Sequence, residues 1–252
     1  PNDDRDVQII WLAGVKRYGR NVNASIVGEY WLAYCVPNGV EYGTGKANLR
    51  AGLQPPLSVL IDNTYKDSCG CYIRSEIWAC LAPGNPELAA RYAYEDAIVD
   101  HEGEGMYGEI FFAALQSAAF VESDKRKLID IALSYIPEES KTTAAIRKAM
   151  ECYDKHVEFT EARKEIHNTA PGTLGVQSGT IQDIPAEGIE GMEIGAPGLD
   201  ATENVAFTIA GWHYGEEALG KSLCMAVAAG RDMDGTCPAL GAALGILRGT
   251  TG

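Results

Sequence analysis

Two short motifs near opposite ends of the sequence contain the oxygen-bearing side chains that hard metal ions prefer. Their oxygen donors are Asn2, Asp3, Asp4, Asp232, Asp234 and Thr236. Carboxylates are the usual protein ligands of Mg²⁺ and Mn²⁺, so each motif is a candidate part of a metal site. Acidic and amide side chains also cap helix N-termini, where the helix dipole stabilises negative charge. Taken alone, each motif is explained more simply by capping.

A glycine-rich segment that follows His101 is a candidate ligand-binding loop. Gly103, Gly105 and Gly108 lie close together directly before a strongly apolar stretch. Glycines at the start of a helix leave backbone amides open to a phosphate or a sugar. The segment is not a nucleotide-binding P-loop, because no Gly-Lys-Ser or Gly-Lys-Thr follows it. A single histidine at a helix end also has a simpler interpretation, since it can interact with the helix dipole alone.

Helical periodicity dominates the rest of the sequence and predicts an all-α fold. Apolar residues recur every three or four positions in the stretches that we expect to be helices, namely 7–18, 26–34, 86–100, 106–120, 125–135, 140–156, 158–167, 205–214, 218–229 and the segment after residue 234. The 106–120 helix is apolar almost all round, so it should be buried at the centre. Residues 37–83 and 168–201 are predicted to be long loops, and loops of that length are usually functional.

Two local predictions belong to these segments. Within 37–83 we expect one short helical piece near residues 46–53, and residues 57–61 are the best candidate for a strand. In the last helix, Gly241 and Gly245 are expected to allow close approach of a neighbouring helix.

Composition excludes several classes of protein. The net charge of −14, from 35 acidic and 21 basic residues, disfavours nucleic-acid binding, because such a surface repels phosphate backbones. No apolar run approaches the roughly 20 residues that cross a bilayer, so we expect no membrane span. The seven cysteines are odd in number and scattered, which does not resemble a disulfide framework. We therefore expect reduced thiols and a cytoplasmic protein.

Taken together and in order, these segments resemble the ADP-ribosylglycohydrolase family, which includes the dinitrogenase reductase-activating glycohydrolases. The residues 2–4 stand where the family carries a Thr-Asp-Asp motif, and Gly70 with Arg74 resembles a glycine-rich segment that leads to an arginine. Further similar segments are 93–97 with His101, 107–114, 204–207, 214–216, 220–222 and 230–234. The resemblance implies one multi-helix domain with long loops over residues 1–252. The family's opening helix is expected to be missing.

The resemblance also implies an activity and a set of site residues. It implies a hydrolase that removes ADP-ribose from a protein side chain, or cleaves a related N- or O-glycoside, with two divalent cations, Mg²⁺ or Mn²⁺. The implied catalytic residues, which also hold the metals, are Asp3, Asp4, Asp232 and Asp234, with Asn2 and Thr236 at the edge of the metal site. The implied substrate-binding residues are Gly70, Arg74, His101, Gly105, Tyr107 and Gly108. The expected partner is an ADP-ribosylated protein or a small ADP-ribose or glycoside substrate.

A second class of function stays open at this stage. Met233 and Gly235 stand within the closing acidic motif, where the family often has threonine. A methionine offers no hard oxygen to a metal ion. The alternative is a non-catalytic relative, either an ADP-ribose-binding module or a structural protein like the lens crystallins that this family resembles.

Overall fold

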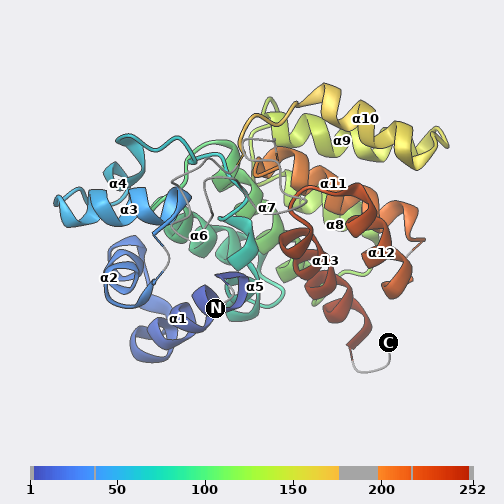
Figure 1. The fold of residues 1–252 in the computed structure, drawn as a ribbon. Coiled ribbons are helices and arrows are strands. Elements are labelled where there is room, and N and C mark those ends of the chain that lie inside the picture. The colour runs from blue at the N-terminus through green and yellow to red at the C-terminus, as the bar shows by residue number, and fades with distance from the viewer. Residues whose placement is uncertain (1–2, 37, 176–197, 217, 250–252) are drawn as a thin grey trace.

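The computed structural model describes residues 3–36, 38–175, 198–216 and 218–249, and these are arranged as helices joined by loops (Figure 1). The α-helices are α1 (Asp3–Tyr18), α2 (Ala24–Tyr34), α3 (Val40–Arg50), α4 (Leu57–Leu60), α5 (Glu76–Leu81), α6 (Pro86–Ala97), α7 (Glu104–Ala118), α8 (Lys125–Leu133), α9 (Lys141–Asp154), α10 (Phe159–Thr169), α11 (Ala201–Tyr214), α12 (Leu219–Ala229) and α13 (Met233–Arg248). Two short 3₁₀ helices are η1 (Gly19–Asn21) and η2 (Tyr72–Arg74). The prediction of an all-α fold is confirmed.

Helix α7 is the centre of the fold, as its apolar sequence predicts. Phe111, Phe112 and Leu115 are almost wholly buried in it, and so are its polar residues Glu109 and Gln116. Helices α5, α6, α8, α9, α11 and α13 all pack against it. A helix that contacts neighbours on every side gains little from an amphipathic stripe, so its sequence is apolar all round.

The 37–83 segment is more helical than its sequence indicates. It contains α3, α4, η2 and α5, and α3 begins earlier than the helical piece expected near residues 46–53. The strand candidate at 57–61 is wrong, because Leu57–Leu60 forms the short helix α4. Pro56 directly precedes it, a position where proline suits a helix start, and the buried Ser58 hydroxyl donates to the Val99 carbonyl. Outside helices, the described residues contain one isolated bridge, between Ser68 and Asp200.

The described part of the long loop before α11 is hydrogen-bonded to Asp200, the N-cap residue of that helix. The amides of Thr173 and Leu174 both donate to Asp200 Oδ2, and the Gly198 amide donates to the Leu174 carbonyl. Residues 176–197 lie outside the described ranges. None of the described helices has the length and apolar character needed to cross a membrane.

The two ends of the chain approach the same short element. Helix α1 contacts η2 and α5, and α13 contacts η2 from its own side. Figure 1 shows the start of α1 close to α5, with α13 nearby. The three residues of η2 therefore lie between the first and the last helix of the described chain.

Candidate functional site

The first acidic motif lies at the beginning of α1. Asp3 and Asp4 are in its first turn, where the helix dipole favours negative charge. The Tyr42 hydroxyl donates to Asp3 Oδ2 at 3.3 Å. Gln8, one turn further on, donates both to the Asp4 carbonyl at 3.0 Å and to Glu76 Oε2 at 2.9 Å. These contacts fix the start of α1 against α3 and α5. Asn2 lies outside the described residues.

The second acidic motif begins at the N-cap of α13. Asp232 follows Gly230 and Arg231, whose φ values of 81° and 67° lie in the left-handed region. The Tyr72 hydroxyl of η2 donates to Asp232 Oδ2 at 3.2 Å. The same carboxylate lies against Gly235, where any β-carbon would overlap Oδ2. Glycine is required there because the carboxylate occupies the space of a side chain.

The remaining residues of this motif point in different directions. Asp234 is exposed, and the Met233 side chain is 44% exposed. Thr236 is wholly buried, and its hydroxyl donates to the Met233 carbonyl at 3.4 Å within α13. Of the three, Asp234 is the one whose carboxylate is open to solvent beside Asp232.

The two motifs share one electrostatic environment. The pKa of Asp232 is raised to about 7, first by burial of its carboxyl and then by the negative charges of Asp234 and Asp4, against hydrogen bonds from Cys69 and Tyr72 that lower it. The carboxylate of Asp4, near the beginning of the sequence, is therefore close enough to oppose the ionisation of Asp232, near its end. A cation bound between like charges would relieve that repulsion.

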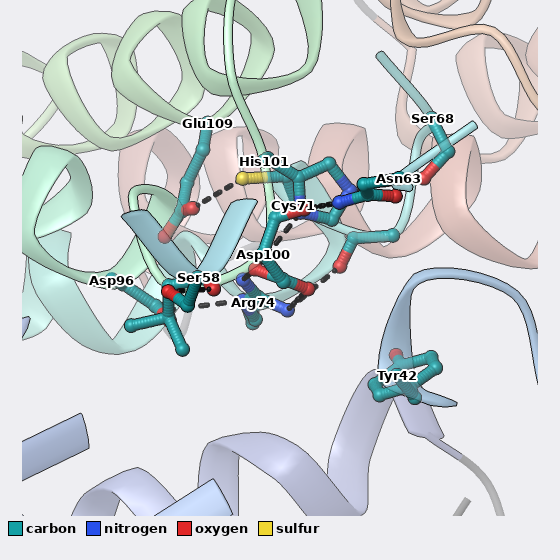
Figure 2. Close-up of polar contacts among 12 residues, drawn as sticks. Tyr42, Ser58, Asn63, Ser68, Cys71, Arg74, Asp96, Asp100, His101 and Glu109 are labelled. Atoms are coloured by element: carbon teal, nitrogen blue, oxygen red, sulfur yellow. Dashed lines mark hydrogen bonds and ion pairs between the residues drawn. The ribbon is translucent and has the colours of Figure 1, made fainter. Parts of the chain in front are cut away.

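Arg74 is wholly buried and contacts Asp96 and Asp100 (Figure 2). Its guanidinium donates to Asp100 Oδ1 at 2.6 Å, to Asp96 Oδ2 at 3.2 Å and to the Gly70 carbonyl at 3.2 Å. The two acids hold the pKa of Arg74 well above its ordinary value despite burial, which acts to lower it. In this structure the guanidinium braces the Gly70 loop, and the predicted contact of Gly70 and Arg74 with substrate stays a prediction.

His101 is also wholly buried and lies in a chain of polar side chains (Figure 2). Its Nε2 lies 2.9 Å from Ser68 Oγ, and its Nδ1 lies 2.9 Å from Asp100 Oδ1. Through Asp100 it connects to Arg74. The structure brings His101, Arg74 and Gly70 together, but it places the imidazole inside the protein and not at the surface of a cavity.

The glycine-rich segment forms the start of α7. Its first amide, that of Glu104, donates to Asp67 Oδ1 at 3.0 Å, so a protein carboxylate already occupies the position expected for a phosphate. Gly105 and Gly108 are buried, and a β-carbon at Gly105 would overlap the Lys66 carbonyl oxygen. Tyr107 is half-buried. These glycines allow close packing, and their role toward a substrate stays a prediction.

The comparison with known protein families identifies the family to which this chain belongs. The family model described as ADP-ribosylglycohydrolase matches residues 1–252. The chain belongs to the ADP-ribosylglycohydrolase family. No individual curated protein matches it significantly. Membership confirms the resemblance seen in the sequence and supports a glycosyl hydrolase activity on ADP-ribose linkages.

One buried acidic residue beside the candidate site was not singled out in the sequence. Glu41, in the first turn of α3, is buried, and its carboxyl lies so close to Gly70 that any β-carbon there would overlap Oε1. Burial raises the pKa of Glu41 to about 7, although His101 acts to lower it. Nothing in the local sequence marks this glutamate, because it looks like an ordinary acidic residue near a helix start. Only the packing of α3 against the Gly70 loop identifies it.

The acidic residues of the candidate site offer the donor atoms that a hard divalent cation prefers. Asp3, Asp4, Asp232 and Asp234 all offer carboxylate oxygens, and the negative charges of Asp234 and Asp4 add to burial in raising the pKa of Asp232. Within the part of the chain that the structure describes, no three His, Cys, Asp or Glu side chains surround a single point as metal ligands do. The charge and donor type of these four acids are those of a cation-binding site.

Proposed function

We propose that this chain is a divalent-cation-dependent hydrolase that removes ADP-ribose from a protein side chain or cleaves a related N- or O-glycoside. The observation that carries the proposal is that α1 and α13 both pack against η2, which brings Asp4 near enough to Asp232 to contribute, after burial and Asp234, to its raised pKa. Family membership supplies the reaction class. The likeness does not extend to a particular leaving group, so the substrate is proposed at the level of an ADP-ribose conjugate.

In this proposal, two ions, Mg²⁺ or Mn²⁺, would be held by Asp3, Asp4, Asp232 and Asp234, with Asn2 and Thr236 at the edge. Such ions supply positive charge that orients ribose hydroxyls and activates a water molecule. The surrounding carboxylates favour the positive charge that develops on the ribose as the glycosidic bond breaks.

Glu41 is the proposed proton donor to the leaving group. A carboxyl with a pKa of about 7 still carries a proton near neutral pH, which is the condition for general acid catalysis by a glutamate. His101 bonds to Ser68 and Arg74 donates to the Gly70 carbonyl, and these contacts fix the loop against which Glu41 packs. After bond cleavage, Glu41 is ionised and can accept a proton from the attacking water.

The experiment is release of free ADP-ribose from an ADP-ribosylated protein, measured by chromatography with Mn²⁺, with Mg²⁺ and with EDTA. We expect turnover with either cation, none with EDTA, and a loss of kcat of roughly 100-fold or more in Asp232→Asn and in Glu41→Gln. Equal release in EDTA would contradict the cation dependence, and full activity of Glu41→Gln would contradict its role.

A second candidate function is a non-catalytic ADP-ribose-binding or structural relative. It is favoured by the exposed Met233 and by the Thr236 hydroxyl, which is bonded within α13 and not directed toward Asp232. The same assay separates the candidates. A binding module would bind ADP-ribose without turnover, and a structural relative would neither bind nor hydrolyse it.

A further inference from the structure

The turn that delivers Asp232 to the site is conformationally unusual. Gly230 and Arg231 are consecutive residues in the left-handed region, and Arg231 has a side chain that disfavours it. The direction of Asp232 depends on this turn, because Asp232 is the next residue and the N-cap of α13. A strained conformation persists only where surrounding contacts hold it.

Three side chains from α10 and α11 contact the turn, at Ala229, Arg231 and Asp232. Arg163 donates through Nε to the Ala229 carbonyl. Glu203, which is 1% exposed, lies with Oε2 3.3 Å from Arg231 Nε. Asn204 accepts the Asp232 amide hydrogen on Oδ1 at 3.1 Å.

Asn204 is the most constrained of the three. It is wholly buried, and its Nδ2 donates to the Gly198 carbonyl at 2.8 Å and to the Asp200 carbonyl at 2.9 Å. Because both Nδ2 hydrogens bond to these carbonyls, the orientation of the carboxamide is fixed, and its Oδ1 faces the backbone amide of Asp232. The buried carboxamide therefore fixes the position of that backbone.

We propose that Asn204 is a positioning residue for Asp232, and that Glu203 supports it by holding Arg231. This inference rests on the proposed function, since it assigns Asp232 to the metal site. Asp232 is then held at two points, its amide by Asn204 and its carboxylate by Tyr72. Mutation of a side chain that orients a metal ligand typically weakens metal binding by roughly 10- to 100-fold.

The test is Mn²⁺ affinity by titration calorimetry in Asn204→Leu, with Thr208→Val as the matched control. Thr208 is buried on the same helix, but its hydroxyl bonds only to the Asn204 carbonyl within α11. We expect Asn204→Leu to weaken Mn²⁺ binding roughly 10- to 100-fold and Thr208→Val to leave it unchanged. In an Asp232→Asn background, Asn204→Leu should add no further loss, because it acts through Asp232.

A second variant covers the case in which Asn204→Leu does not fold. Asn204→Asp keeps the acceptor for the Asp232 amide but loses both Nδ2 donations, so its Mn²⁺ affinity should fall while that of Thr208→Val does not. Wild-type Mn²⁺ affinity in Asn204→Leu, or an equal large loss in Asn204→Asp and Thr208→Val, would overturn the inference. Neither of these two results contradicts the proposed function if Asp232→Asn alone loses Mn²⁺ binding. If Asp232→Asn binds Mn²⁺ as tightly as the wild type, the proposed function is wrong as well.

Discussion

At the scale of single residues, the candidate site contains two glycines, Gly70 and Gly235, whose lack of a side chain leaves room for a carboxylate. The carboxylates of Glu41 and Asp232 lie where β-carbons of Gly70 and Gly235 would be. The glycines expected from the sequence to allow close helix packing are different ones. Gly241 has its nearest neighbour atom 3.9 Å from a built β-carbon, and Gly245 has none within 4 Å, so that expectation is wrong.

Replacing Gly235 by alanine tests the role of that absent side chain. The added methyl group would overlap Asp232 Oδ2 and Ile73 Cγ2, so the carboxylate must move. We expect roughly a tenfold or larger loss of kcat/KM, with a destabilisation of about 1–3 kcal/mol from overpacking. Gly245→Ala in the same helix is the control, since the open space there should give a stabilisation of about 0.5–1 kcal/mol. Unchanged kcat/KM in Gly235→Ala would show that the position of the Asp232 carboxylate does not matter.

At the scale of elements, the helices with strong periodicity could be predicted from the sequence and the short ones could not. The expected helix at 125–135 corresponds to α8, and that at 140–156 to α9, within a few residues at each end. Element η2 has three residues, all buried, and no amphipathic pattern. Its conformation depends on what packs around it, namely α1, α7 and α13. Local sequence carries no signal for an element that tertiary contacts define.

Arg74, the last residue of η2, should be essential to the fold. In Arg74→Met the carboxylates of Asp96 and Asp100 lose their buried counter-ion, and breaking such a pair costs about 3–5 kcal/mol. We expect the urea midpoint to fall accordingly. Arg126→Met is the control, because its pair with Asp154 is half-exposed and worth about 0–1 kcal/mol. Similar losses in the two variants would mean that the Arg74 network is not a buried ion pair of this strength.

At the scale of the whole molecule, the site joins residues that are more than 200 positions apart. Periodicity and composition indicate helices and an acidic surface, but neither predicts which helices pack against each other. The expectation that residues 2–4 and 232–234 share a site came from the family resemblance alone. Physical reasoning from the sequence stops there, because the meeting depends on the packing of α1 and α13 on η2.

Buried acids also make the stability of the whole protein depend on pH. Burial raises the pKa of Glu41 and of Glu76 from 4.5 to about 7, so the folded state keeps protons that the unfolded state releases. Their contribution is full below about pH 4.5 and is lost as the pH rises through about 7. Burial lowers the pKa of His213 to about 3, which opposes this trend only below about pH 6.5.

In EDTA, the free energy of unfolding should therefore fall between pH 6.5 and pH 8, by on the order of 1 kcal/mol for each of Glu41, Glu76 and Asp232, whose pKa values are all raised to about 7. Urea unfolding at the two pH values measures it. Glu41→Gln should show a smaller fall than the wild type, because its neutral amide does not titrate. A stability that rises over this range would contradict the raised pKa values.

The central claim is that the two ends of the chain form one cation site, and Mn²⁺ binding tests it most directly. Titration calorimetry of the wild type, Asp4→Asn and Asp232→Asn compares a change at each end with the same readout. The wild type should bind two Mn²⁺ ions, and each variant should lose at least one of them. If Asp4→Asn binds Mn²⁺ with the affinity and stoichiometry of the wild type, the beginning of the chain is not part of the metal site and the account is wrong.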